Sequence, residues 1–182
     1  MKMKTTCILI TAAILLASCK KEEVSTTAPA AAPSATSPSS ALSKVLDASP
    51  TGEAQSIHLI RATAKPGDEI TVSGKIMGNA EPFVEGRSAF ILGDPEVLTP
   101  CNANPADKCS TPWDNCCDSK EDKKRGIATI QVMDGDGRVL KESVEGVGGL
   151  AKLADVTVSG TVAQGSSADV LIINALAIRT GK

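Results

Sequence analysis

Two seven-residue segments of the chain repeat one pattern of apolar and polar residues, and this pattern limits the possible folds strongly. The segments are I-T-V-S-G-K-I (70–76) and V-T-V-S-G-T-V (156–162), and they match in residue type at every place except the sixth. Apolar side chains alternate with polar ones, as in a β-strand with one buried face. A glycine within each strand indicates a bulge or sharp bend, by which small barrels turn their corners. The repeat therefore predicts a small β-barrel.

Other apolar segments supply the remaining strands of this barrel. They are 88–92, 127–133 and 170–178, with 57–63 as a possible sixth strand. Residues 150–153 have the composition of one helical turn directly before the second copy of the repeat. We therefore expect an all-β domain of five to six strands with at most one short helix.

The order of these elements, three strands, a short helix and two strands, resembles the OB-fold, a partly open Greek-key barrel of five strands. The resemblance covers about residues 70–178. It is best over 150–178, where the helical turn, V-T-V-S-G-T-V and L-I-I-N-A-L-A-I follow one another in the order of that fold. It implies the fold and no ligand. An immunoglobulin-like sandwich is the alternative architecture.

Nucleic acid is not an expected partner of this barrel. The only aromatic residues are Phe83, Phe90 and Trp113, and the formal net charge of the 182 residues is −2. Binding of oligonucleotides needs aromatic side chains for stacking and a clustered basic surface. The sequence offers neither.

The first 18 residues are predicted to be a lipoprotein signal peptide. A basic start (1–4) precedes an apolar run (7–16) of about half the roughly 20 residues that a membrane-spanning helix needs. The following L-A-S-C (16–19) resembles a bacterial lipobox. The resemblance implies that Cys19 becomes the first residue of the mature protein and carries diacylglycerol. Ordinary secretion with cleavage nearby is the alternative.

Residues 19–51 are predicted to be a disordered linker between the lipid anchor and a domain that spans 52–182. Residues 25–41 carry no charge and consist of Ser, Thr, Ala and Pro, which is too little apolar surface to offset ordering. Lys20 follows the lipidated cysteine, where an Asp would mark retention in the inner membrane. We therefore expect the protein at the outer membrane of the cell envelope, with its domain facing the periplasm.

Four cysteines occupy an insertion in the domain at about residues 95–125. They are Cys101, Cys109, Cys116 and Cys117. The run C-S-T-P-W-D-N-C-C-D (109–118) resembles a T-P-W-D-x-C-C segment of uncharacterised bacterial lipoproteins with a similar β-domain. The resemblance implies a shared loop and no known activity. Trp113, Asp114 and Asp118 are possible binding residues of this loop.

Two disulfides are the simplest state of these thiols, because an exported protein meets an oxidising compartment. A bond between the adjacent Cys116 and Cys117 is strained. The remaining pairings are Cys101–Cys116 with Cys109–Cys117, or Cys101–Cys117 with Cys109–Cys116. Trp113 would then pack over the disulfides as the private core of the loop.

A metal site is the alternative and more specific interpretation of the same residues. Four thiolates, or three with Asp114 or Asp118, suit zinc or copper. The spacing C-x7-C-x6-C-C differs from the paired C-x2-C knuckles of zinc ribbons, so we expect no cofactor and keep zinc or copper as the alternative. A redox role of the vicinal pair is a third interpretation.

Other candidate residues have simpler explanations. His58, the only histidine, is expected on one face of the possible strand 57–63, either exposed or hydrogen-bonded. D-G-D-G (134–137) with Glu145 is faintly similar to a calcium loop, but Arg138 and Val139 stand where a ligand and a glycine are required, so we expect a hairpin turn. The mixed-charge run 118–125 is expected to be a solvated loop end.

The expected function is a membrane-anchored binding or scaffold module that acts on an unknown envelope protein. The alternative is a metal-binding or thiol-redox protein that works through the four-cysteine loop. No nucleophile, base and orienting group can be named together in the sequence, so an enzyme is not expected.

Overall fold

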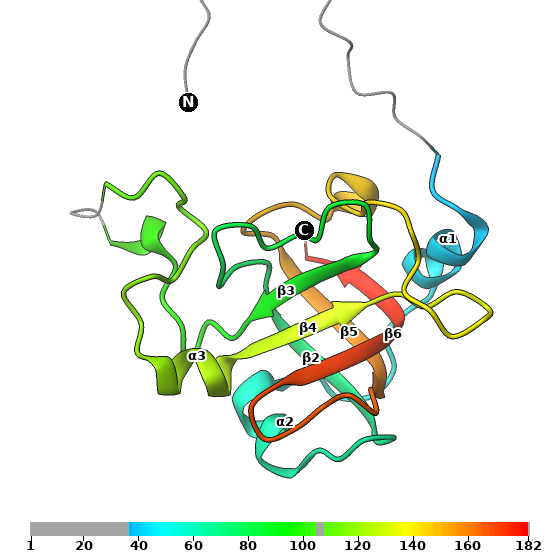
Figure 1. Ribbon diagram of the computed structural model, residues 1–182, viewed down its shortest axis with the longest axis horizontal. Coiled ribbons are helices and arrows are strands. Elements are labelled where there is room, and N and C mark those ends of the chain that lie inside the picture. Colours follow the sequence, from blue (N-terminus) through cyan, green and yellow to red (C-terminus); the bar gives the residue numbers. More distant parts are fainter. Residues whose placement is uncertain (1–36, 105–107, 182) are drawn as a thin grey trace, which may run out of the picture. The chain divides into compact units, whose positions relative to one another are not determined.

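Five strands close into a barrel in the computed structural model, which describes residues 37–104 and 108–181 (Figure 1). The strand order is β1-β2-β3-β4-β6-β5, and a further pairing of β2 with β5 closes the ring. The strands of the barrel are β2 (Glu69–Lys75), β3 (Ala89–Gly93), β4 (Ile127–Gln131), β5 (Asp155–Val162) and β6 (Leu171–Thr180). The prediction of a small barrel is confirmed.

The pairings differ in length and direction around the barrel. β2 and β5 pair antiparallel along seven positions, whereas β2 and β3 pair only at Lys75 and Gly93. β4 runs parallel to β6, and the other neighbours in the ring are antiparallel. β1 (Gln55–Ser56) adds a short parallel strand beside β2. The sixth strand is therefore present, but it lies before the segment expected to form it.

Each copy of the repeated pattern places its glycine where another backbone comes close. A Cβ on Gly74 would lie 2.7 Å from the carbonyl oxygen of Gly93, and one on Gly160 would overlap the carbonyl oxygen of Asn174. The register of β5 against β6 shifts between Ser159 and Gly160. The bulge predicted from the mid-strand glycine of β5 is therefore confirmed.

The expectation of at most one short helix is wrong. The described residues form the α-helices α1 (Ser40–Asp47), α2 (Ile57–Thr63) and α3 (Lys120–Gly126), and the 3-10 turns η1 (Cys101–Ala103) and η2 (Val147–Gly149). The helical turn expected at 150–153 is not present, and η2 lies directly before it.

The segments of α2 and α3 have features that favour helices, although the sequence predicts a possible strand over 57–63 and a loop end over 118–125. Ile57 and Ile60 of α2 are both buried, and three positions apart is the spacing of one helical face. At the start of α3, the side chain of Ser119 accepts a hydrogen bond from the backbone of Asp122. The first turn of α3 is acidic and its last turn is basic, which suits the helix dipole. The possible strand 57–63 is therefore the helix α2, and most of the mixed-charge run 118–125 belongs to the helix α3.

Helix α1 is part of the folded domain, although the sequence predicts its residues to belong to the linker. The side chain of Leu42 is fully buried in the barrel's core cluster. The Ser39 side chain accepts a hydrogen bond from Leu42 N at 3.3 Å and donates one to the Glu142 carboxylate. Helix α1 therefore packs as part of the barrel domain.

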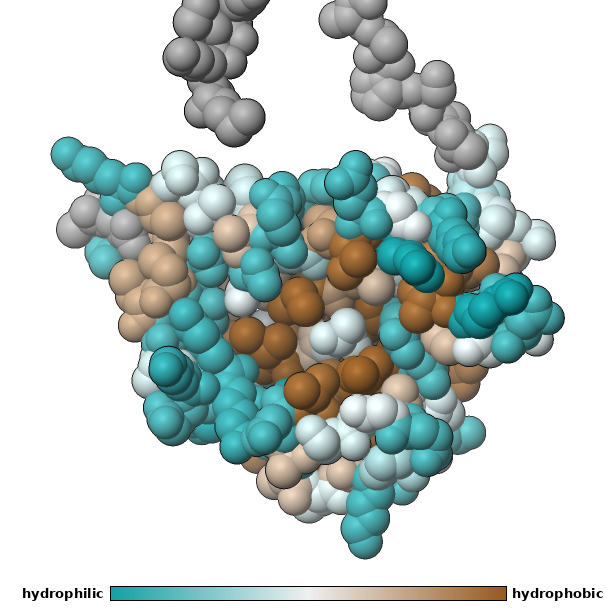
Figure 2. Space-filling view, in the orientation of Figure 1, coloured by the Kyte–Doolittle hydropathy of each residue, from teal (hydrophilic) through white to brown (hydrophobic). Residues whose placement is uncertain are grey.

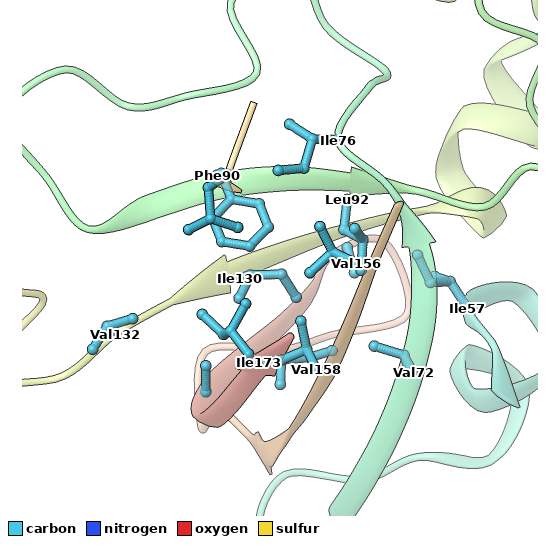
Figure 3. Close-up of a cluster of buried hydrophobic side chains, with 14 of the residues drawn as sticks. Ile57, Val72, Ile76, Phe90, Leu92, Ile130, Val132, Val156, Val158 and Ile173 are labelled. Carbon is cyan, nitrogen blue, oxygen red and sulfur yellow. The ribbon is translucent and has the colours of Figure 1, made fainter. Parts of the chain in front are cut away.

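The core fills the inside of the barrel with aliphatic side chains and one phenylalanine. Phe90, Ile130, Ile173, Val158 and Val72 come from the five different strands and are at most 1% exposed. Figure 3 shows these side chains pointing toward one another between the strands. Alternate residues of β3, β4 and β6 therefore face outward.

Candidate functional site

The cysteine loop connects β3 to β4 from a fixed base. At this base the backbone N–H of Asp94 donates to the carbonyl of Gly126 at 2.8 Å. Leu98 is 1% exposed, and a Cβ on Gly126 would lie 2.9 Å from its Cγ. The two ends of the loop are thus packed together before the cysteines begin.

Backbone hydrogen bonds then draw the two arms of the loop together. The N–H of Cys101 donates to the carbonyl of Asp114 at 2.8 Å, and the N–H of Asn102 donates to the carbonyl of Pro112 at 2.9 Å. Cys101 is buried in η1, whereas Cys116 is exposed on the opposite arm. These hydrogen bonds bring the two cysteines face to face.

Trp113 attaches the loop to the barrel. Its indole Nε1–H donates to the carbonyl of Ala80 at 2.8 Å, and its own carbonyl accepts from the N–H of Gly78 at 3.1 Å. The ammonium of Lys152 lies 4.3 Å from the centroid of the indole ring, close enough for a cation–π contact. These partners all lie outside the loop, so Trp113 is more than a private core over the cysteines.

Three of the four sulfur atoms gather at one point. The Sγ atoms of Cys101 and Cys116 are 3.6 Å apart, and those of Cys101, Cys109 and Cys116 all lie within 4.8 Å of one another. Cys117 Sγ lies 3.8 Å from Cys116 Sγ but outside this group of three. We call Cys101, Cys109 and Cys116 the thiol triad.

The two predicted disulfides are not present among the described residues. A disulfide needs sulfur atoms about 2.05 Å apart, far less than the 3.6 Å between Cys101 and Cys116 or the 3.8 Å between Cys116 and Cys117. Two disulfides require two separate pairs, whereas the loop directs three sulfur atoms to one place. The triad therefore has the arrangement of a ligand set.

The thiols of the triad differ in acidity. Burial raises the pKa of Cys101 to about 12, and the hydrogen bond with the Cys116 thiol adds to this effect. The Thr111 hydroxyl, 3.2 Å from the sulfur, lowers the pKa of Cys109 by a hydrogen bond. In the metal-free protein, Cys109 is thus the more readily ionised of these two thiols.

Asp114 and Asp118 lie in the loop but outside the triad. Asp114 Oδ1 accepts from the N–H of Asn115 at 2.7 Å, and Asp118 Oδ2 accepts from the N–H of Thr99 at 2.9 Å. Both carboxylates therefore shape the loop backbone. Asn115 is 1% exposed, and its side-chain amide has no hydrogen-bond partner among the described residues.

A second group with metal-ligand chemistry is formed by His58, Asp94 and Glu96, whose ligand atoms lie within 4.8 Å of one another. His58 Nδ1 is 2.8 Å from Asp94 Oδ2, and the backbone N–H of His58 donates to the same oxygen at 2.9 Å. Asp94 Oδ1 accepts from the N–H of Glu96 at 2.9 Å. Asp94 is buried and its two oxygens are engaged, so this group joins α2 to the end of β3.

The expectation of a hydrogen-bonded His58 is confirmed, although the residue lies on α2 and not on a strand. Sequence reasoning missed its partner Asp94. The two residues are 36 positions apart, and no local pattern connects them.

D-G-D-G (134–137) forms a hairpin turn, as expected. The N–H of Asp134 donates to the carbonyl of Arg138 at 2.7 Å, and Met133 pairs with Val139. The backbone N–H of Arg138 also donates to the Asp134 carboxylate, which lowers the pKa of Asp134. The Asp134 carboxylate is thus hydrogen-bonded within its own turn.

The predicted signal peptide and the lipidation site Cys19 lie outside the described residues. Within the described part of the chain, no helix combines the length and the apolar character that crossing a membrane requires.

Comparisons of the chain with protein families, with curated proteins and with solved structures find no match.

Proposed function

We propose that this protein is a lipid-anchored envelope protein that binds a soft metal ion, copper(I) or zinc, through the thiol triad. The observation that carries the proposal is the convergence of three Sγ atoms within 4.8 Å of one another. Thiolates are the ligands that copper(I) and zinc prefer. This proposal takes up the alternative interpretation of the sequence, a metal-binding protein that works through the four-cysteine loop.

The sulfur separations support coordination. Two thiolates on one tetrahedral zinc ion, with Zn–S bonds of about 2.3 Å, lie about 3.8 Å apart. The 3.6 Å between Cys101 and Cys116 is close to that value. Metal binding also supplies the energy for deprotonating the buried thiol of Cys101, because thiolates and not thiols are the ligands.

The number of donors favours copper(I) over zinc. Structural zinc is almost always bound by four ligands, and the triad supplies three. Cys117 is the nearest further thiol, but vicinal cysteines rarely reach one ion together. The buried amide of Asn115 precedes Cys116, and a donor of this kind beside a thiolate site would stabilise the charge on sulfur.

We also propose that the barrel is an OB-fold. The support is the strand order of the ring, β2-β3-β4-β6-β5, together with the parallel pairing of β4 and β6. The cysteine loop is then an insertion between the second and third strands of that barrel.

The anchor and the location rest on the sequence of the first 20 residues. Acylation of Cys19 would hold the protein at the outer membrane, with the metal site in the periplasm and an envelope protein as the partner that delivers or receives the ion. Labelled fatty acid should be incorporated into the wild type and not into a Cys19→Ser variant. Equal labelling of both would disprove the anchor.

Metal analysis of the purified full chain tests the proposed function. Reduced protein, loaded anaerobically with copper(I) or zinc and then desalted, should retain one ion per chain. Cys101→Ser, Cys109→Ser and Cys116→Ser should each lose most of it, and Cys117→Ser, outside the triad, should retain it. Retention by all four variants would contradict the proposal.

A further inference from the structure

A basic pocket lies beside the cysteine loop, where β4 and β6 begin. It has a volume of about 350 Å³, and its cations are Arg61, Lys120, Lys123 and Lys124. Asp169 is the acidic residue that lines it, and this carboxylate forms an ion pair with Lys124. Four cations around one carboxylate leave an excess of positive charge, which favours an anionic ligand.

Arg61 is held in place within this pocket. Its Nη2 donates to the carbonyl of Ile127, and its Nη1 donates to the carbonyl of Ala168 at 3.4 Å. Its Nε is buried without a hydrogen-bond partner among the described residues. Desolvation lowers the pKa of Arg61, yet a guanidinium stays charged at neutral pH. The pocket is therefore lined by a cation held in a fixed position.

An apolar outer face begins at the wall of the same pocket. Ile91, Thr129 and Ile172 are register neighbours on β3, β4 and β6. They alternate with the buried Phe90, Ile130 and Ile173, so they point away from the core. We define the outer face as Ile91, Ile127, Thr129 and Ile172.

The pocket and the outer face are continuous. Ile127 and Thr129 line the pocket and also belong to the outer face, and the adjoining Val170 is 44% exposed. Figure 2 shows apolar surface over β3, β4 and β6 beside hydrophilic surface over α3. An occupant of both parts must be amphiphilic, with an anionic group at one end.

We propose that the basic pocket and the outer face together bind one phospholipid with an anionic headgroup. The phosphate lies among Arg61, Lys120 and Lys124, and the first part of an acyl chain covers Thr129 and Ile172. Charge selects the headgroup, because a zwitterionic lipid brings a choline cation toward these side chains. The site uses none of the triad sulfur atoms, and its link to the triad is the hydrogen bond that Lys123 donates to the carbonyl of Cys116 at 3.3 Å.

The test uses short-chain phospholipids as monomers in solution and the full chain carrying Cys19→Ser, which leaves no covalent acyl chain to compete. Calorimetry compares dihexanoyl-phosphatidylglycerol with dihexanoyl-phosphatidylcholine and with inorganic phosphate. Phosphatidylglycerol should bind at least about tenfold more tightly than either of the other two.

Substitutions in the basic pocket and the outer face test where the phospholipid binds. Lys120→Gln and Lys124→Gln should each raise the Kd for phosphatidylglycerol by about fivefold or more. Ile172→Ser should weaken phosphatidylglycerol binding and leave phosphate binding unchanged. Lys44→Gln on α1, outside the pocket, is the matched control, and thermal unfolding shows that the lysine variants remain folded.

Three results would overturn the proposal. Equal affinity for the two phospholipids would exclude selection by charge. Equal affinity for phosphate and phosphatidylglycerol would mean that the site takes an anion and no lipid. Unchanged affinity in both lysine variants would mean that the lipid binds elsewhere.

Discussion

The sulfur atoms of Cys101 and Cys116 lie 3.6 Å apart, although 15 positions separate the residues in the sequence. The contact exists because the backbone of Cys101 is hydrogen-bonded to Asp114 on the opposite arm of the loop. Since Asp114 is followed closely by Cys116, this hydrogen bond and the one from Asn102 to Pro112 set the position of the thiol pair. The loop backbone thus brings the two thiols together.

The attachment of this loop to the barrel can be tested at Trp113. Trp113→Ala removes the hydrogen bond to Ala80 and the contact with Lys152, and should lower the free energy of unfolding by about 1–3 kcal/mol. Trp113→Phe keeps a ring for Lys152 and should cost less. Urea denaturation gives both values. A Phe variant as unstable as the Ala variant would show that the ring contributes nothing.

The acidity of the thiols predicts an order of alkylation in the reduced, metal-free protein. The thiolate is the reactive form. Cys109, with its lowered pKa, should therefore react with iodoacetamide faster than Cys101, whose pKa is about 12. The rate at Cys101 should still rise about tenfold per pH unit above pH 9, where that at Cys109 levels off. Mass spectrometry of quenched samples measures both rates, and equal rates at pH 8 would contradict this order.

The same raised pKa has a consequence for stability. An unfolded thiol ionises near pH 9, whereas folded Cys101 holds its proton to about pH 12. The unfolded state therefore binds fewer protons in this interval, so the stability of the metal-free protein falls as pH rises through it. Cys101→Ser should show a weaker loss of stability in alkaline urea titrations. A wild type whose stability is unchanged between pH 9 and pH 11 would contradict this expectation.

The buried carboxylate of Asp94 should be important for the fold. Asp94→Ala leaves the backbone N–H groups of His58 and Glu96 and the His58 ring without their acceptor, and should lower the free energy of unfolding by about 3–5 kcal/mol. The exposed neighbour Glu96 is the control, since Glu96→Gln should change stability by less than about 0.5 kcal/mol. Equal effects of the two substitutions in thermal unfolding would argue against a structural role of Asp94.

Two glycines of the same hairpin region form a matched pair for the barrel itself. A Cβ on Gly160 would overlap the backbone of Asn174, whereas one on Gly165 would lie 3.6 Å from Ile172 Cδ1, an ordinary contact. Gly160→Ala should therefore destabilise the protein by about 1–3 kcal/mol, and Gly165→Ala by much less. Chemical denaturation of both variants compares them directly, and a Gly160→Ala protein of wild-type stability would contradict the close approach.

The barrel could be predicted from the sequence because its strands carry a local signal. Alternation over 70–76 and 156–162 is a period-two pattern that requires no knowledge of distant residues. The same reasoning was wrong at 57–63, where a short apolar segment fits a strand or a helix equally well. There, the burial of both Ile57 and Ile60 decides for the helix.

The sequence could predict that the four cysteines of the loop lie near one another. It could not predict which three of them form the thiol triad. Its selection depends on which arms of the loop are hydrogen-bonded, and such pairing has no sequence signature. The basic pocket was missed for the same reason, because Arg61 lies on α2, before β2, whereas Lys124 lies on α3, between β3 and β4.

Intact mass of the purified native protein, recorded without reductant and before any metal is added, tests the proposed metal site most directly. The mass under denaturing conditions should correspond to four thiols, and under native conditions it should increase by one copper or zinc ion. A Cys109→Ser variant should lack the bound ion. A mass lower by four hydrogen atoms in the wild type, with no ion under native conditions, would show two disulfides and contradict the account.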